Sequence, residues 1–259
     1  MTSLVSRAVA NLSQSAAGMF LVLFGAAALA WGAYTFPLFW RQASIDHVAT
    51  RVIEGDHFKT GALIELLPTV QATEKDDCRP DVVRSAAIIR LRLSEDTFAA
   101  GERDRIDGSL NSLRDSIRRS LGCSPADPFL WLVFFRVENT LNGFSPDHLA
   151  YLRESYRLGP NEGWIALKRN GLALAIFEQL PPDIADMALA EFASLLDSGF
   201  QREALAIFTG PGWRVRALLL ERLKKVSEIS REAFAYALYA DGYDVDVPGI
   251  KRPDPRPWH

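Results

Sequence analysis

The amino-acid sequence predicts an all-α protein, with one N-terminal transmembrane helix followed by an array of α-helical hairpins. Three observations support this fold class: a long uncharged apolar segment near the N-terminus, helical periodicity from Ser44 to Ala240, and prolines and glycines that divide this region into helix-length segments. The alternating pattern of β-branched residues expected of sheet strands joined by hairpin turns is not seen.

Length and composition fit a folded chain that does not bind nucleic acid. The 259 residues are enough for one large domain or two small ones. Apolar residues make up 48% and charged residues 24%, as in ordinary globular proteins rather than disordered ones. The 29 basic and 32 acidic residues leave a net charge of −3. Nucleic-acid-binding proteins usually carry a basic excess, so we expect no nucleic-acid partner.

The N-terminal region divides into a short tail, residues 1–15, and an apolar segment, residues 16–40, that we predict to be a transmembrane helix. No residue from Ala8 to Trp40 is charged. As a helix, residues 16–40 would extend about 37 Å, against a hydrocarbon core of roughly 30 Å. The end of the segment is rich in aromatic side chains that favour the membrane interface, namely Trp31, Tyr34, Phe36, Phe39 and Trp40.

A cleaved signal peptide is the alternative for this segment. Arg7 would supply its positive region, and Ala28-Leu29-Ala30 resembles a cleavage site. Cleavage there would leave a strongly apolar and aromatic start on the mature chain, and this favours the anchor.

We expect a single-pass protein of the bacterial inner membrane whose soluble part lies in the periplasm. Arg7 precedes the apolar segment, whereas Arg41 and Arg51 follow it, so the charges give only a small asymmetry. Cys78 and Cys123 are an even count that could form a disulfide in an oxidising compartment, with two buried thiols as the alternative. A soluble part that faces the cytoplasm remains the other orientation.

The soluble region, residues 41–240, is predicted to consist of helices joined by short breaks. The expected helices cover about residues 44–54, 56–67, 81–98, 102–121, 129–141, 145–158, 161–179, 181–198, 200–209, 213–226 and 230–240, with a loop over 71–80. The segment 129–141 is the most apolar after the anchor but too short to span a bilayer, so we expect it to be the central core helix. Residues 241–259, with four prolines in the last twelve, predict an extended or disordered tail.

Several spacings resemble those of tetratricopeptide repeats. Pro125 and Pro160 are 35 residues apart, and Trp131 and Trp164 are 33 apart, close to the period of such repeats. The sequence Trp164-Ile-Ala-Leu167 is similar to the opening of a repeat's first helix. Further matches stand at the ends of helices or at the offsets of a second helix: Ser155, Leu158, Gly199, Ala204 and Phe208.

This resemblance extends from Pro125 to Phe208 and implies paired helices, which commonly present a concave surface to protein partners. Lys168 and Gly171 occupy places where glycine and tyrosine are usual, so the repeats would be degenerate. The overall layout of anchor, helical array and polar tail is similar to single-pass helical-repeat proteins that accompany bacterial exopolysaccharide assembly.

No catalytic residue, metal site or cofactor site is predicted. The four histidines lack the spacing of two metal ligands on one helix face, and no phosphate-binding loop or nucleophile motif occurs. Glu138, near the end of the most apolar helix, is the one acid that burial could turn into a general acid. A structural role is the alternative, because Arg136 and Asn139 lie beside it in sequence.

Aromatic and basic side chains within the helical region are the candidate partner-binding residues. Such groups together can bind an acidic peptide or stack on a sugar ring of an anionic glycan, and core packing of the two tryptophans is the alternative. The candidates are Trp164, Lys168, Arg169, Trp213, Arg214 and Arg216.

These observations predict a membrane-anchored, non-enzymatic scaffold or interaction protein. Its expected partners are proteins of an envelope complex, and contact with a polysaccharide is a further expectation. An enzyme, or enzyme subunit, whose active site the sequence does not reveal is the alternative. Loss of function on replacing one or two acids would favour the enzyme, whereas co-purification of a partner would favour the interaction protein.

Overall fold

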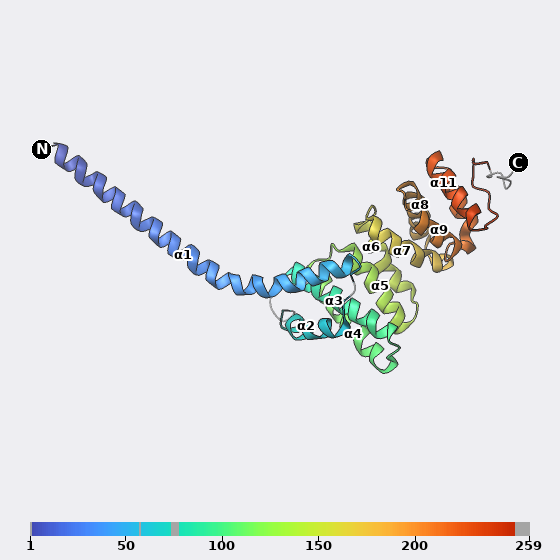
Figure 1. Cartoon of the computed structure of the whole chain (residues 1–259), viewed down its shortest axis with the longest axis horizontal. Helices are drawn as coiled ribbons and strands as arrows, with labels where there is room; N and C mark the ends of the chain where they lie inside the picture. The colour runs from blue at the N-terminus through green and yellow to red at the C-terminus, as the bar shows by residue number, and fades with distance from the viewer. Residues whose placement is uncertain (1, 57, 74–77, 252–259) are drawn as a thin grey trace. The chain divides into compact units, whose positions relative to one another are not determined.

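The protein is helical throughout the part that its computed structural model describes, residues 2–56, 58–73 and 78–251. Helices joined by turns make up these residues, and no strand occurs among them (Figure 1). The all-α prediction is therefore confirmed. The chain divides into two compact units, Met1–Ser116 and Ile117–His259.

Helix α1, Thr2–Ile53, is one continuous helix (Figure 1). It contains the stretch Gly18–Phe36, whose mean hydropathy is 1.7 and which is long and apolar enough to cross a membrane. None of that stretch is buried. The apolar stretch lies within the predicted segment 16–40. The sequence also predicts that a new helix begins at Ser44, and this start is wrong, because α1 runs from Thr2 to Ile53 without a break. The helix continues through Pro37 and ends before Gly55, whose φ of 93° is a conformation that favours glycine.

The end of α1 packs within the first unit, mainly on α3, Pro80–Ala99. Ile45 and Ala49, one turn apart on the same face of α1, are buried. The Ser85 hydroxyl of α3 also donates a hydrogen bond to Asp46 Oδ1 over 3.1 Å. Helix α1 thus carries an exposed apolar stretch and then contributes to the core of the unit that follows it.

Helix α2, Thr60–Thr73, extends through Pro68 and ends beyond the expected boundary at Leu67. The predicted loop from residue 71 is accordingly wrong at its start. Leu63 and Val70 lie two turns apart on the face of α2 that is buried in the core. Continuing the helix through the proline keeps both side chains in the core, and this outweighs the single backbone hydrogen bond that proline cannot make.

The second unit holds most of the shorter helices. Helix α4, Arg103–Cys123, crosses the boundary between the units. The helices after it are α5 (Pro128–Asn142), α6 (Leu149–Leu158), α7 (Gly163–Ala175), α8 (Pro182–Asp197), α9 (Gln201–Thr209), α10 (Arg216–Leu223) and α11 (Glu228–Ala240), with 3-10 turns at Pro146–His148, Phe177–Gln179 and Trp213–Val215. The bounds follow the sequence prediction closely, except that three expected helices begin or end as 3-10 turns.

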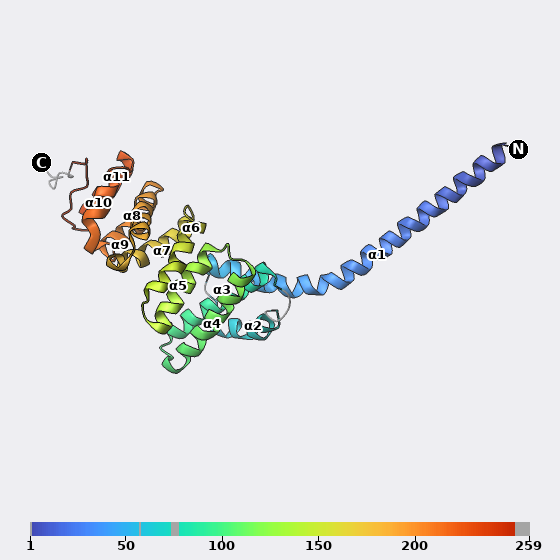
Figure 2. The same ribbon diagram turned by 180° about the vertical axis from the view of Figure 1, so that it is seen from behind.

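Apolar side chains of α5 and of the C-terminal helices form the core of this unit. Most of α5 is buried, as the sequence predicts for a central helix, and Asp127 caps its start by accepting hydrogen bonds from the backbone of Phe129 and Leu130. Figure 2 shows α8, α9 and α11 together near the C-terminal end of the unit. Phe192, Phe208 and Phe234, one from each of these helices, contact one another at ring-centroid distances of 5.4 to 6.1 Å.

The chain after α11 is held against the second unit as far as the structure describes it. Val247 is buried, and Arg231 Nη1 donates a hydrogen bond to the carbonyl oxygen of Pro248. The Tyr243 ring lies 5.6 Å from that of Trp213. The start of the predicted tail is therefore ordered by specific contacts, and its residues 252–259 lie outside the described residues.

Candidate functional site

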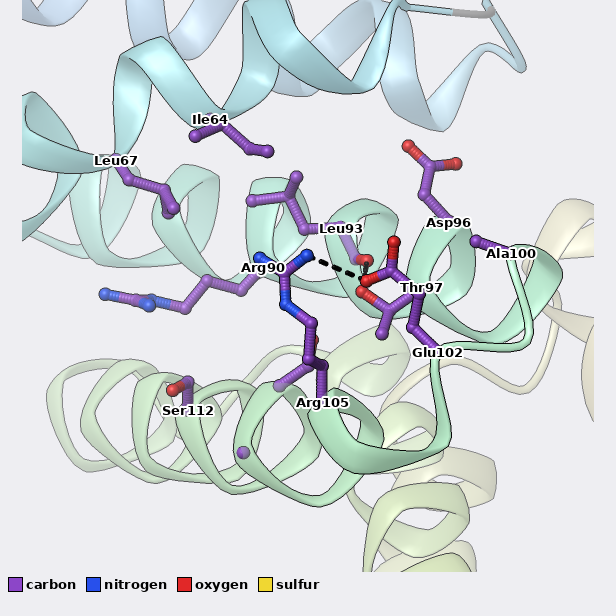
Figure 3. Close-up of a pocket in the computed structure, with 12 residues that line it drawn as sticks. Ile64, Leu67, Arg90, Leu93, Asp96, Thr97, Ala100, Glu102, Arg105 and Ser112 are labelled. Carbon is purple, nitrogen blue, oxygen red and sulfur yellow. Dashed lines mark hydrogen bonds and ion pairs between the residues drawn. The ribbon is translucent and has the colours of Figure 1, made fainter.

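A cleft of about 410 Å³ in the first unit lies where α2, α3 and α4 meet (Figure 3). Ile64 and Leu67 of α2 cover one side, and Arg105 and Ser112 of α4 lie on the other (Figure 3). Between them, α3 and the connection to α4 contribute Arg90, Leu93, Asp96, Thr97, Ala100 and Glu102. A volume of this size is within the range of sites that bind small molecules or single side chains of a partner.

The cleft exists because α4 presents small side chains toward α2 and α3. Gly108, Ser109 and Ser112 line it one turn after Arg105, on the side of α4 away from its buried apolar stripe. A side chain built on Gly108 would meet nothing within 4 Å. Leucine at these positions would fill the space, so the sequence of α4 leaves the cleft open.

Charged groups at the cleft combine with its aliphatic wall. Arg105 Nη1 and Glu102 Oε2 form an ion pair of 2.8 Å at one end, and Arg92 Nη2 and Asp96 Oδ1 form another of 3.1 Å. The Arg90 side chain extends along the cleft toward Ser112 (Figure 3). Guanidinium groups next to leucine and isoleucine suit a ligand that has an apolar group with a carboxylate nearby.

A second polar feature, in the second unit, is the ion pair between Arg169 of α7 and Glu191 of α8. Its nitrogen and oxygen, Nη2 and Oε1, are 2.5 Å apart, and the two side chains are 0% and 5% exposed. Arg169 also donates to the carbonyl oxygens of Ser155 and Gly159, at 2.6 and 2.9 Å, at the C-terminal end of α6. The pair thus fastens three consecutive helices: it adds a second donor to the Ser155 carbonyl oxygen, which also accepts from Gly159 N–H over 3.1 Å, and a donor to the Gly159 carbonyl oxygen at the end of α6.

Tyr156 and Asn170 complete this buried cluster. The Tyr156 hydroxyl and Asn170 Nδ2 both donate to Glu191 Oε2, at 3.1 and 3.3 Å, and the Arg169 guanidinium lies 4.1 Å from the Tyr156 ring centroid. Burial raises the pKa of Glu191, although the charge of Arg169 opposes that shift. Burial, and secondly the charge of Glu191, raises the pKa of Tyr156 well above its ordinary value. The cluster is a structural clamp, because its donors are directed at Glu191 and at backbone carbonyl oxygens. Among the described residues, Asn170 Oδ1 is a buried oxygen of this cluster without a hydrogen-bond partner.

The structure separates the six candidate partner-binding residues. Trp164, on α7, is half-buried, with its ring 4.9 Å from Phe129, whereas Lys168 is exposed. Arg169 is fully buried in the clamp, so its assignment to a partner-binding surface is wrong. The stripe Ile165-Ala166-Arg169-Asn170-Ala173 recurs at steps of one and three along α7, and this periodicity predicts burial of Arg169 and Asn170.

The remaining three candidates lie around the 3-10 turn at Trp213–Val215. The Trp213 ring contacts Phe208 edge-on at 5.9 Å, and the Arg216 guanidinium lies 4.7 Å from the Trp213 ring centroid. Arg214 and Arg216 are exposed. The predicted aromatic and basic combination therefore occurs at Trp213, with Arg216 already stacked on its ring.

Glu138 and the cysteines are also engaged. Glu138 is buried and forms an ion pair with Arg118 over 3.0 Å, and Asn142 Nδ2 donates to its other oxygen over 2.8 Å. Both carboxylate oxygens of Glu138 are thus engaged by side chains of the fold, and this indicates a structural role. Cys78 and Cys123 are both disulfide-bonded. Within the described ranges, no cluster of histidine, cysteine, aspartate and glutamate has the make-up of a metal site.

Comparisons with protein-family models, with curated proteins and with solved structures find no match to this chain. Its function is therefore inferred from its own residues.

Proposed function

We propose that the chain is a membrane-anchored interaction protein that binds a segment of a protein partner in the cleft at α2, α3 and α4. The continuity of α1 carries this proposal. One helix contains both an exposed apolar stretch, Gly18–Phe36, and the side chains of Ile45 and Ala49 that are buried in the first unit. An anchor of this kind holds the cleft-bearing unit at the membrane without a flexible linker.

The chemistry of the cleft favours a peptide segment as its occupant. Ile64, Leu67 and Leu93 can receive one apolar side chain. A guanidinium group has five N–H donors, so Arg90 and Arg105 can donate to carboxylates on either side of it in addition to their partners within the chain. Peptides that bind by such anchors are common among helical adaptor proteins. The partner segment would accordingly be apolar at its centre and acidic at its flanks.

Envelope assembly is the setting that we propose for this binding. A soluble part on the periplasmic side of the inner membrane agrees with the disulfide-bonded state of Cys78 and Cys123, because disulfides persist in oxidising compartments. The likeness in layout to helical-repeat proteins of exopolysaccharide assembly, together with hairpins similar to tetratricopeptide repeats, favours a role as a scaffold in such a complex.

Photo-crosslinking tests the cleft as a partner-binding site. A photoreactive residue in place of Ile64, an exposed side chain of the cleft, should yield one adduct with a protein of the same membrane. Ser112→Trp fills the cleft and should abolish the adduct, whereas Asp107→Trp, on an exposed position of α4 outside the cleft, should preserve it. An adduct that persists in Ser112→Trp, or the absence of any adduct, would contradict the proposal.

A further inference from the structure

Helix α11 has a second apolar face that the fold does not use. Its inner face buries Phe234 and Leu238, both 0% exposed. On the opposite side, Ile229, Ala233, Tyr236 and Ala240 follow one another at steps of four, three and four residues. Ile229 is 79% exposed and Tyr236 66%, and Tyr239 beside them is 43% exposed.

An exposed apolar face of this kind is unusual on a helix that already packs its other face in the core. Contiguous exposed apolar side chains commonly mark an interaction surface. The exposed Ile229 and Tyr236 alternate along this face with the small side chains of Ala233 and Ala240, so another helix can approach it closely.

Carboxylates border this face on one side. Glu228 and Glu232, four residues apart, are exposed, and neither is paired with a basic side chain within the described ranges. The basic residues nearby are directed elsewhere: Arg231 donates to the carbonyl oxygens of Val226 and Pro248, and Lys224 pairs with Glu221. The border of the face is therefore acidic.

We propose that the outer face of α11 docks a basic amphipathic helix of a protein partner. Apolar residues of that helix would cover Ile229, Ala233 and Tyr236, and its lysines or arginines would pair with Glu228 and Glu232. A second copy of this chain fits less well, because the same face offers no basic group to these carboxylates. An anionic lipid surface is disfavoured, because it would repel them.

This interface goes beyond the cleft, which lies in the other unit and selects acidic rather than basic segments. The two surfaces therefore predict different partners or different segments of one partner. Their separate charge requirements also make the two proposals distinguishable by experiment.

A photoreactive residue in place of Tyr236, in the full-length chain in its own membrane, tests the proposal. The expected product is an adduct with another protein, mapped by mass spectrometry to a segment with apolar residues bordered by lysine or arginine. Glu228→Lys with Glu232→Lys should lower the yield by about tenfold. Changing the mapped basic residues to glutamate should restore it. A photoreactive residue at Ala150, exposed on α6, is the control and should not capture this segment.

Several outcomes would overturn the proposal: an adduct with a second copy of the chain, with residues 252–259 of the same chain or with lipid, an adduct insensitive to the charge reversal, or no adduct. The helical circular dichroism should be retained in each variant, because the replaced side chains are exposed. Glu228 lies in the first turn of α11, so its change to lysine should lower the free energy of unfolding by no more than about 1 kcal/mol. These measurements separate a lost interface from a lost fold. Ser112→Trp should leave the adduct at Tyr236 intact, so failure of the cleft and failure of this interface give different results.

Discussion

Arg169 and Glu191 lie on consecutive helices and form an ion pair that is closed off from solvent. The arginine also holds two backbone carbonyls of a third segment, and the glutamate accepts from a tyrosine and an asparagine. A charge inside a protein is tolerated only when such partners replace water. This pair therefore fixes the arrangement of α6, α7 and α8.

Removing one member of the pair should destabilise the second unit strongly. Arg169→Met leaves Glu191 Oε1 and the Gly159 carbonyl oxygen without the donor that Arg169 supplies and removes the countercharge of the buried carboxylate. We expect a loss of about 3 to 5 kcal/mol in the free energy of unfolding. The double variant Arg169→Met with Glu191→Leu should lose less than the sum of the single variants. Urea unfolding of the four proteins in detergent measures the coupling, and strictly additive losses would contradict the clamp.

The stability of the second unit should depend on the titration of Glu191. Burial raises the pKa of this carboxyl above its ordinary value of 4.5, so the folded protein binds the proton more tightly than the unfolded chain. The contribution of Glu191 to stability is therefore greatest below pH 4.5 and falls as the pH rises through the raised pKa. Glu191→Gln removes this dependence. The free energy of unfolding, measured between pH 4 and about 8, should therefore depend on pH differently in the unaltered protein and in Glu191→Gln. Parallel curves for the two proteins would contradict the raised pKa of Glu191.

Reduction of the disulfide should destabilise the protein. The bond closes a long loop in the unfolded chain, and we expect reduction to cost about 2 to 4 kcal/mol. The melting temperature should fall on adding dithiothreitol, and the double variant Cys78→Ser with Cys123→Ser should not respond. Thiol labelling of the denatured, unreduced protein should find no free cysteine. Labelling of both cysteines would show that the thiols stay reduced in the cell.

The C-terminal part of α1 should matter for folding as well as for anchoring. Ile45→Ala removes a buried side chain from the core of the first unit and should cost about 2 to 4 kcal/mol. Thr50→Ala, on an exposed position of the same helix, is the control and should change stability by less than about 0.5 kcal/mol. Equal effects of both variants on the unfolding midpoint would place Ile45 outside the core.

Local patterns in the sequence predict most of the helices because each pattern lies within one helix. Within the predicted helix 102–121, apolar residues recur at steps of four, three, four and four: Ile106, Leu110, Leu113, Ile117 and Leu121. Asp127 with the proline after it marks the start of the next helix, so neither pattern depends on a distant residue. Two helix boundaries are predicted wrongly: the end of a helix before Pro68 and the start of a new helix at Ser44. Both helices continue past these points and bury Val70 and Ile45, and this burial depends on packing against α3, which a local pattern does not reveal.

The sites are less accessible to sequence reasoning. From its charge and its position next to Lys168, Arg169 is predicted to lie on the surface. The one indication of its burial is its helical spacing from Ile165 and Ala173, which are buried. Its partner Glu191 is 22 residues away on another helix. The cleft depends on three helices at once, and the small residues of α4 look unremarkable until α2 is placed opposite them.

Alkaline carbonate extraction of membranes tests the central claim, that α1 anchors the chain. The full-length polypeptide should remain in the membrane pellet, and a variant with Val22→Arg and Leu29→Arg in the apolar stretch should move to the supernatant. Release of the unaltered full-length chain by carbonate, or recovery only of a shorter polypeptide that begins after Ala30, would contradict the anchor.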